Sequence, residues 1–416
     1  MKAVLAYSGG LDTTVAIRWL QVKYSYDVIT VTVDVGQGDD FRALEYRAKS
    51  AGAIKHYTID AKAEFISNYV MPCIKANGLY EDKYPLATAL ARPLIAEKVV
   101  SIARREGTNI LAHGCTGKGN DQLRFDITMK ALMPDCKIIA PVRDMNLNRE
   151  QELEFAREHG IEVAEEAKKY SIDQNLWGRA IEGGMLEHAD TEPEQDAFRW
   201  VKVNPKDMPD EPYYMSIKFD NGMPIAIDDI SCNDYHDAIK LIDYANIQAG
   251  KHGVGIVDHI EDRVVGIKSR EVYEAPAAIA IIEAHKDLEK LVLTNHQLRF
   301  KRYVEQQWSM LTYSGLWLEP LREDLDKFID STQRYVNGKV TLKMYKGALR
   351  VVSRSSSYSL YDEGLSTYGR GSTFDQSLAK GFVELWGLQS IVANKIRRRM
   401  RDKNSNSYSN GEYYEG

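Results

Sequence analysis

A short run of small and hydroxyl-bearing residues, Ser8 to Thr14 (SGGLDTT), has the composition of an anion-binding loop. Its two adjacent glycines let the backbone turn tightly and approach a ligand. The hydroxyls of Ser8, Thr13 and Thr14 add hydrogen-bond donors. The run joins an apolar stretch, expected to be a strand, to a stretch of helix length. Because the free amides at a helix amino terminus attract anions, the loop predicts a phosphate ligand.

Neither of the two commonest phosphate motifs is present in this run. It contains no lysine, which a Walker loop requires, and it lacks the G-x-G-x-x-G spacing of a dinucleotide-binding turn. It resembles instead the S-G-G-x-D-S/T loop of the N-type ATP pyrophosphatases. That resemblance implies cleavage of ATP between the α and β phosphates and adenylation of a carbonyl or carboxyl oxygen. Asp12 could help to hold Mg²⁺ or could cap the helix, and both alternatives stay open here.

A second glycine-rich stretch, His113 to Phe125 (HGCTGKGNDQLRF), also follows a predicted strand. Ligands of α/β proteins bind at the carboxyl ends of the strands. Thr116, Asn120 and Asp121 offer a hydroxyl, an amide and a carboxylate, which suit the carboxylate and ammonium groups of an amino acid. Arg124 follows Asn120 by four residues, so the two share a face if this segment is helical. The alternative is a polar loop with a capping aspartate.

The elements that position these loops alternate along the first part of the chain. Short apolar or β-branched runs predict strands, and segments of helical length follow them. The predicted strands are 4–7, 28–33, 54–59, 109–113 and 138–140, and the predicted helices are 15–22, 41–51, 64–75, 90–106 and 149–159. This alternation predicts an α/β fold with a parallel sheet covered on both faces.

After about residue 165 prolines punctuate the chain and the pattern becomes α+β. The segment Asp220-Asn221-Gly222 predicts a hairpin turn between two strands. The remaining predicted elements are strands 214–219, 224–227, 264–267, 339–345 and 348–353, a helix 235–248, a solvated loop 353–368 and one long helix 374–400. We therefore predict an α/β domain over 1–167, an α+β domain over 168–370, a C-terminal helix over 371–402 and a polar tail over 403–416.

Composition excludes several classes of protein. Lys and Arg total 54 and Asp and Glu total 60, so the net charge of the 416 residues is −6, which gives no global field for nucleic acid. No run reaches the roughly 18 apolar residues of a membrane-spanning helix. The four cysteines form no C-x-x-C pair, and the nine histidines show no metal-ligand spacing. We expect a reducing, cytoplasmic compartment and neither nucleic acid nor membrane as a partner.

Together the two loops resemble the argininosuccinate synthase family. Further matching segments span the chain: 32–38 (TVDVGQG), 91–95 (ARPLI), 170–173 (YSID), 182–184 (EGG), 250–255 (GKHGVG), 266–274 (GIKSREVYE) and 343–347 (KMYKG). The resemblance implies ATP-dependent ligation of citrulline and aspartate to argininosuccinate in arginine biosynthesis, through a citrullyl-adenylate, with release of AMP and pyrophosphate. It also implies that 1–167 is an ATP-binding domain of the adenine nucleotide α-hydrolase type, with Mg²⁺ carried with the phosphates. It further implies that 168–370 is a synthetase, substrate and multimerisation domain and that 371–402 is an oligomerisation helix of a homotetramer.

Position by position, the resemblance implies three groups of binding residues. ATP would be held by Ala6, Tyr7, Ser8, Gly9, Gly10, Leu11, Asp12, Thr13, Thr14, Val33 and Gly114. Aspartate would be held by Thr88, Thr116, Asn120 and Asp121, and citrulline by Tyr84, Asn120, Arg124, Ser171, Glu261 and Tyr273. Catalytic roles would fall to Asp12, Thr116 and Asp121, and the protein ligands of a metal are unknown.

The chain departs from the family pattern at two positions, and two alternative functions stay open. The family often has serine where this chain has Ala89 and Ala180, so two citrulline contacts would be missing. A tRNA-modifying adenylating enzyme is one alternative, and Cys115 would be its best candidate for a reactive thiol. An inactive nucleotide-binding subunit is the other. On composition alone, Glu261 and Tyr273 belong to a solvated, charged strand end, and only the resemblance makes them candidates.

Overall fold

The structure is a computed structural model that describes residues 1–146, 149–161, 169–232 and 234–408. Contacts divide the chain into two compact units, Met1–Leu360 and Tyr361–Gly416. In the part of the chain that the structure describes, no helix is long and apolar enough to span a membrane. The domain boundary predicted at residue 167 falls outside the described residues, and the predicted division into domains stays a prediction.

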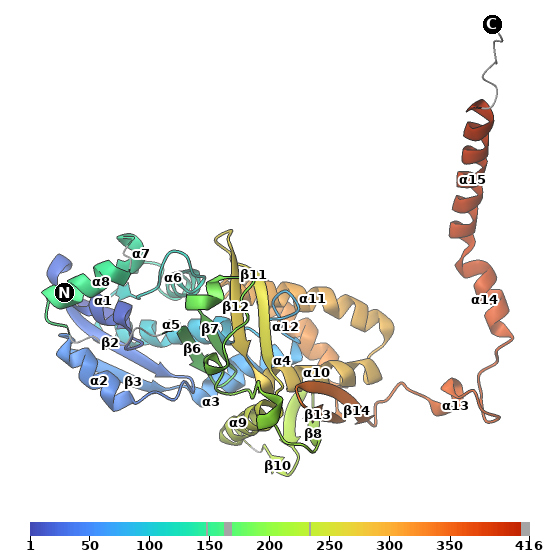
Figure 1. Cartoon of the computed structure of the whole chain (residues 1–416), viewed down its shortest axis with the longest axis horizontal. Coiled ribbons are helices and arrows are strands. Elements are labelled where there is room, and N and C mark those ends of the chain that lie inside the picture. Colours follow the sequence, from blue (N-terminus) through green and yellow to red (C-terminus); the bar gives the residue numbers. More distant parts are fainter. Residues whose placement is uncertain (147–148, 162–168, 233, 409–416) are drawn as a thin grey trace, which may run out of the picture. The chain divides into compact units, whose positions relative to one another are not determined.

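A five-stranded parallel sheet carries both glycine-rich loops. Figure 1 labels two of its strands, β2 and β3. Its strands are β1 (Lys2–Ala6), β2 (Asp27–Asp34), β3 (Lys55–Asp60), β4 (Ile110–Ala112) and β5 (Lys137–Ile139). They lie in the order β3-β2-β1-β4-β5. The chain therefore adds β2 and β3 on one side of β1 and then crosses over to add β4 and β5 on the other side. Such a switch point opens a crevice at the carboxyl ends of the strands, where α/β proteins bind ligands. The sheet confirms the predicted α/β fold.

Helices cover both faces of this sheet, as the strand–helix alternation predicts. On one face Leu5 and Val28 pack with Trp19 of α1 (Leu11–Tyr24) and Leu44 of α2 (Phe41–Ser50). On the other face Val4 and Ile29 share a core with α5 (Ala87–Glu106). The other helical segments of this part are α3 (Lys62–Phe65), the π-turn η1 (Ile66–Val70), α4 (Met71–Lys75), α6 (Asp121–Leu132), α7 (Pro141–Asp144) and α8 (Arg149–Glu158).

Two antiparallel sheets follow, in agreement with the α+β pattern. The first has the order β11-β12-β7-β6, with strands β6 (Ser171–Asn175), β7 (Gly178–Glu182), β11 (Ile256–Asp262) and β12 (Lys268–Glu274). The second has the order β10-β9-β8-β13-β14, with strands β8 (Tyr213–Asp220), β9 (Met223–Ile227), β10 (Ile230–Ser231), β13 (Gly338–Tyr345) and β14 (Ala348–Ser355). Both predicted hairpins, β8–β9 and β13–β14, are present.

Helices of this second part complete a core that continues from the parallel sheet. One buried cluster runs from β1 and β2 through α5 to α10 and β13. The longer helices are α9 (Tyr235–Lys251), α10 (Pro276–Val292), α11 (Asn295–Tyr313) and α12 (Pro320–Gln333), and the single turns are η2 (Gly184–Glu187), η3 (Gln195–Ala197) and η4 (Pro205–Asp207). The continuous core ties the parallel sheet to the antiparallel sheets within unit 1.

The strand predicted over 264–267 is wrong. Val264 and Val265 lie in the turn between β11 and β12, and Gly266 adopts a φ of +88°, outside the extended region. The two strands on either side of the turn pair over seven residues from Ile256↔Glu274 to Asp262↔Lys268. Three β-branched residues around one glycine favoured a strand here, whereas the true strands are rich in charged residues.

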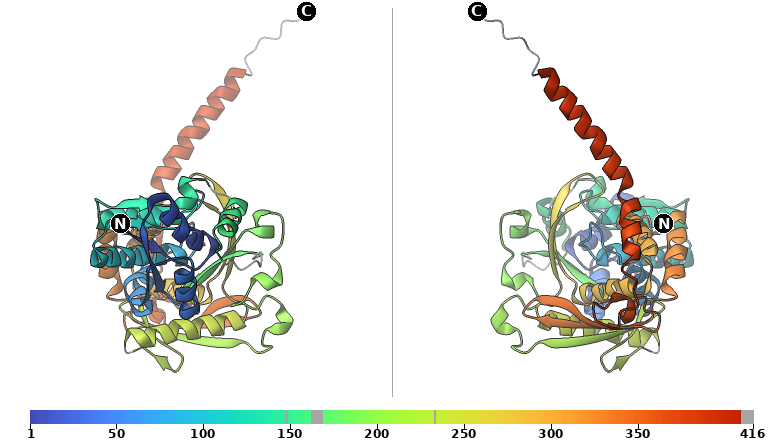
Figure 2. Two further views of the ribbon diagram at one scale, coloured as in Figure 1. Left: turned by 90° about the vertical axis from the view of Figure 1, so that its left-hand side faces the viewer. Right: turned by 90° about the vertical axis from the view of Figure 1, so that its right-hand side faces the viewer.

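The single helix predicted over 374–400 is also only partly right. Unit 2 contains a short helix α13 (Glu363–Ser366), then α14 (Leu378–Trp386) and α15 (Leu388–Tyr408), which follow one another in the chain (Figure 2). Gly387, the residue type least suited to a helix interior apart from proline, separates them. Asp375 accepts the backbone N–H of Ser377 at 2.9 Å, a local bond that competes with helix formation before residue 378.

Candidate active site

The loop after β1 has the geometry of a phosphate cradle. Gly9 has a φ of +77°, and a Cβ there would lie 2.1 Å from Leu44, so only glycine fits. The Thr14 hydroxyl donates to the Gly10 carbonyl at 2.7 Å, and the Ser8 and Thr13 hydroxyls lie 3.2 Å apart. Helix α1 begins at Leu11 and directs its first amides toward the loop. The strand, the tight turn and the helix of the predicted anion loop are therefore present, and the anion itself stays a prediction.

The two glycine-rich loops touch each other at the switch point between β1 and β4. A Cβ on Gly114 would lie 2.8 Å from the Thr13 methyl group and 3.2 Å from the Thr13 backbone nitrogen. Glycine at 114 therefore lets the second loop approach the phosphate loop closely. The residues that follow Gly114, which include Thr116 and Asn120, begin at the edge of the predicted ATP site.

Asp12 is not the helix cap that one alternative proposed. The cap of α1 is Gly10, and Asp12 lies in the first turn of the helix. Among the described residues, no group of three or more His, Cys, Asp or Glu side chains could hold a metal ion. Mg²⁺ in nucleotide sites is usually bound through one or two carboxylates plus the substrate phosphates. Asp12 beside the phosphate loop fits that arrangement.

Several predicted citrulline residues form one buried network around Glu261. Tyr273 donates its hydroxyl to Glu261 Oε2 at 2.8 Å, and the ring of Tyr84 stacks on Tyr273 with 4.2 Å between centroids. Tyr313 donates to Glu261 Oε1 at 2.6 Å and accepts from Asn120 Nδ2 at 2.8 Å. Burial opposes ionisation of Glu261, but the side chains that donate to it hold its pKa below the ordinary value. The network is thus arranged around an ionised carboxylate.

Asp121 and Arg124 form an ion pair in the first turn of α6. Arg124 Nη1 lies 2.9 Å from Asp121 Oδ1, and Arg124 Nε donates to the Tyr313 carbonyl at 3.0 Å. Arg124 Nη2 is buried and has no hydrogen-bond partner in the parts of the chain that are described. A buried, unpaired guanidinium nitrogen is costly unless a ligand completes it. Arg124 can therefore receive a carboxylate from a substrate.

Arg92, on α5, joins the start of α6 to the four-stranded antiparallel sheet. Its Nε lies 2.9 Å from Asp121 Oδ2, and its Nη2 pairs with Asp173 of β6. Burial disfavours the charge on Asp121, but the guanidinium groups of Arg92 and Arg124 outweigh it and lower the pKa of Asp121. Burial, together with the nearby Asp121, raises the pKa of Asp173 despite Arg92. Of the two carboxylates, Asp121 keeps its charge to lower pH.

One face of the four-stranded sheet collects the remaining predicted residues. Asp173 pairs in register with Ala180, and Ala180 pairs with Tyr273, so these three side chains share a face. Ser171, two residues before Asp173, stands on the same face with an exposed side chain. Position 180 thus lies inside the site but supplies no hydroxyl.

The other predicted residues lie around these loops. Thr88 donates its backbone N–H to the Tyr84 hydroxyl at 2.9 Å, next to buried Ala89. Thr116 is exposed in the second loop, and Val33 is buried near the end of β2. The sequence prediction missed Tyr313, Arg92 and Asp173, although 91–95 and 170–173 were among its matching segments. For Tyr313 no local motif existed, since its importance arises only when α11 packs beside α6.

Cys115 does not have the surroundings of a reactive thiol. Burial and then the charge of Asp121 raise the pKa of Cys115 above its ordinary value, although Arg92 acts in the opposite direction. A reactive cysteine needs a stabilised thiolate, which calls for a lowered pKa. This argues against the thiol chemistry that a tRNA-thiolating enzyme would need.

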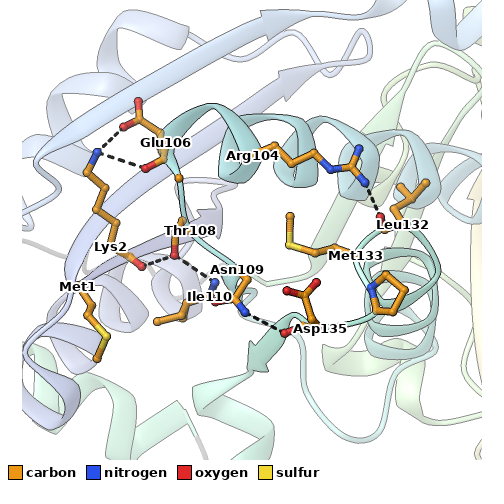
Figure 3. Close-up of a pocket in the computed structure, with 12 residues that line it drawn as sticks. Met1, Lys2, Arg104, Glu106, Thr108, Asn109, Ile110, Leu132, Met133 and Asp135 are labelled. Atoms are coloured by element: carbon orange, nitrogen blue, oxygen red, sulfur yellow. Dashed lines mark hydrogen bonds and ion pairs between the residues drawn. The ribbon is translucent and has the colours of Figure 1, made fainter.

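A groove of about 780 Å³ lies elsewhere, at the amino ends of the parallel strands (Figure 3). Lys2 and Ile110, which begin β1 and β4, line it together with Glu106 and Asp135. Several of its polar groups bond to each other, for example Lys2 Nζ to Glu106 Oε2 at 2.9 Å. None of the predicted site residues lines this groove, so it is distinct from the candidate active site.

The parallel sheet and its phosphate-type loop at the switch point define a nucleotide-binding protein of the HUP class. The family model described as the arginosuccinate synthase N-terminal HUP domain matches residues 2–162. The family model described as the arginosuccinate synthase C-terminal domain matches residues 170–393. The chain belongs to the argininosuccinate synthase family.

Curated relatives agree with this over nearly their full length. The argininosuccinate synthase of Pyrococcus furiosus is 56% identical over 393 residues, which are 94% of each chain. That of Saccharolobus solfataricus is 52% identical and covers 95% of this chain and 100% of the relative. That of Pyrobaculum aerophilum is 53% identical, with 96% and 99% covered.

Proposed function

We propose that this chain carries out the reaction of its family, in which ATP drives the joining of citrulline and aspartate to argininosuccinate, with release of AMP and pyrophosphate. The observation that carries this proposal is the contact between Gly114 and Thr13. It sets the loop with amino-acid-binding groups directly beside the phosphate loop. An amino-acid substrate held there can meet the α-phosphate of ATP.

Each part of the site receives one substrate in this proposal. The loop from Ser8 to Thr14 binds the phosphates, and Asp121 and Thr116 bind the ammonium and carboxylate groups of aspartate. Arg124, through its unpaired Nη2, and the network around Glu261 bind the amino-acid end of citrulline. The ureido group of citrulline then extends toward the phosphate loop, and the aspartate amine approaches it from α6.

The chemistry needs positioning and charge stabilisation more than a protein acid or base. The citrulline ureido oxygen attacks the α-phosphorus, and pyrophosphate leaves. The aspartate ammonium group then loses a proton to become an amine, the amine attacks the ureido carbon and loses a second proton, and AMP leaves with the oxygen. The amides of α1 and the hydroxyls of Ser8 and Thr13 stabilise charge on the departing pyrophosphate. Mg²⁺ bound to the phosphates, with Asp12 beside it, would neutralise part of the same charge.

Product analysis tests this function. The loop has no lysine that would reach the β and γ phosphates, so ATP with citrulline and aspartate should give AMP and pyrophosphate in equal amounts to argininosuccinate. Omission of either amino acid should abolish argininosuccinate. Stoichiometric ADP would contradict the assignment.

Assembly as a homotetramer is part of the same proposal. Phe382, Leu385 and Trp386 of α14 and Ile391 and Val392 of α15 are exposed apolar side chains. Such a concentration of apolar surface usually marks an interface, and we assign it to other copies of this chain. All four cysteines are unpaired, which supports a reducing, cytoplasmic compartment.

A further inference from the structure

Arg92 is the link between three elements that meet at the active site. It lies in the second turn of α5, and its guanidinium group reaches Asp121 at the start of α6 and Asp173 on β6. The Arg92 side chain is 16% exposed, whereas those of Asp121 and Asp173 are 28% and 34% exposed, so both ion pairs are partly buried. Partly buried pairs hold geometry more firmly than fully exposed pairs do, because loss of the carboxylates would leave the Arg92 charge poorly solvated.

The two oxygens of Asp121 are each held by a different arginine. Oδ2 receives Arg92 Nε and Oδ1 receives Arg124 Nη1, both at 2.9 Å. Two opposed contacts fix the plane of the carboxylate, whereas one contact would leave it free to turn. A carboxylate has about four lone-pair sites, so an ammonium group can still bind after both arginines are engaged. The orientation of Asp121 toward that ammonium group therefore depends on both arginines.

Asp173 gives Arg92 a second anchor and balances its charge. Without Asp173, the guanidinium group would be tied only to Asp121 and would compete with an ammonium group for the same carboxylate. With Asp173 in place, Arg92 has a second carboxylate to pair with. The charge of Asp121 then stays available to the ammonium group of aspartate. Asp173 stands on the same sheet face as Ser171, so this link also connects the proposed aspartate and citrulline subsites.

We propose that Arg92, anchored by Asp173, is a positioning residue that orients Asp121 for the aspartate ammonium group. It touches neither amino acid and acts through Asp121. The inference rests on the proposed function, because it concerns the residue that binds aspartate there. It predicts that loss of Arg92 weakens aspartate binding selectively, before it affects citrulline or ATP.

The test compares Arg92→Gln, Arg92→Lys and Asp173→Asn with the unchanged chain. Arg92→Gln should raise the KM for aspartate about tenfold or more, which corresponds to about 1.4 kcal/mol. The KM for citrulline should stay within twofold. Exchange of an oxygen isotope between the bridging and non-bridging positions of ATP (isotope scrambling) reports adenylation of citrulline when aspartate is absent. This scrambling should persist in Arg92→Gln. Lysine keeps the charge but lacks the planar fork with which Arg92 reaches both carboxylates, so the KM of Arg92→Lys for aspartate should be intermediate. Asp173→Asn should move the aspartate KM in the same direction.

A double variant and a control separate positioning from general support. Arg92→Gln combined with Asp173→Asn should be little worse than Arg92→Gln alone, since both changes break one link. Arg322→Gln removes another largely buried arginine, which pairs with Asp326 on the same helix at 2.6 Å. It should lower the unfolding temperature without moving the aspartate KM.

Two results would overturn the inference. One is an unchanged aspartate KM in folded Arg92→Gln or, if that variant does not fold, in Asp173→Asn. The other is loss of scrambling to the same extent as loss of aspartate binding, because a general support would affect both steps. Failure of the proposed function has a different signature. It would appear in the unchanged chain as absent scrambling and absent argininosuccinate.

Discussion

Gly114 lies against Thr13, so that a single added carbon at position 114 would clash with both the methyl group and the backbone nitrogen of Thr13. The close approach of these two residues joins the second glycine-rich loop to the predicted phosphate loop. The clash cannot be relieved by a side-chain rotation alone, because one of the two contacts is with backbone.

Gly114→Ala should therefore push the phosphate loop away from its position. We expect the KM for ATP to rise about tenfold or more while the chain stays folded, as measured by steady-state kinetics and circular dichroism. Gly371→Ala is the matched control, since a Cβ there has no heavy atom within 4 Å. An unchanged KM for ATP in Gly114→Ala would show that the two loops do not form one site.

Asp121 and Arg124 form one ion pair, but we expect substitution of each to affect a different half-reaction. Asp121→Asn should spare adenylation of citrulline but slow ligation by about one to two decades, because a charge-assisted contact of about 1.5–3 kcal/mol is lost. Arg124→Ala should instead damage adenylation. Isotope scrambling in ATP without aspartate measures the first step alone, with Lys130→Ala on the same helix as a control. The reverse pattern would mean that the two amino-acid subsites are exchanged, and loss in both would place Asp121 near ATP as well.

Tyr313 should prove necessary for citrulline binding although no motif marks it. Tyr313→Phe removes one donor to Glu261 and the acceptor of Asn120. A lost hydrogen bond of about 1–1.4 kcal/mol corresponds to a rise of about five- to tenfold in the KM for citrulline. Tyr303→Phe, at an exposed position of the same helix, should change nothing. Equal KM values in the two variants would remove Tyr313 from the site.

The pH dependence of stability should reveal the cluster around Glu106. Hydrogen bonds from Lys2, Lys55 and Tyr57 lower the pKa of Glu106 to about 2. Because folding lowers this pKa, ionised Glu106 stabilises the fold fully at pH values above its ordinary pKa of about 4.5. That stabilisation is lost as the pH falls toward 2. Because both lysines are partly exposed, Glu106→Gln should cost only about 1 kcal/mol at pH 7.

Denaturant unfolding at several pH values checks this prediction. The difference between Glu106→Gln and the unchanged chain should shrink steadily from pH 5 to pH 3. Glu323→Gln, at an exposed position on α12, should show no such trend. A difference that does not depend on pH would mean that Glu106 contributes by packing rather than by charge.

Removal of the C-terminal helices should alter assembly. A chain that ends at Ser372 lacks α14 and α15 and their exposed apolar side chains. Light scattering should show particles smaller than a tetramer, or aggregates, whereas a chain that ends at Tyr408 should assemble normally. A soluble tetramer of unchanged size after the longer deletion would refute this role for the helices.

The parallel sheet could be predicted from sequence because burial on both faces leaves a plain signal. Strands such as β2 are continuous β-branched runs, and the glycines of both loops sit where strands end. The antiparallel strands β6, β7 and β11 could not be found in this way. They carry charged residues such as Asp173, Glu182 and Glu261, because one of their faces looks into a polar site. A hydrophobic pattern fails where a sheet face carries polar and charged side chains.

The site itself was predictable only as far as local motifs reach. Asn120, Asp121 and Arg124 lie within one stretch, so their cooperation could be read from spacing. Tyr313 follows them by nearly two hundred positions, at the end of a helix whose role depends on tertiary packing. Contacts of that range require the fold before they can be recognised.

The register of the four-stranded sheet limits how this enzyme can change during evolution. Ser171 and Asp173 face the site, while Ile172 between them belongs to the opposite face. Deletion of one residue within β6 would exchange the two faces and replace both polar groups at once. Insertions and deletions should therefore be confined to the connections between these strands, and new substrate preferences must arise by substitution at every second position.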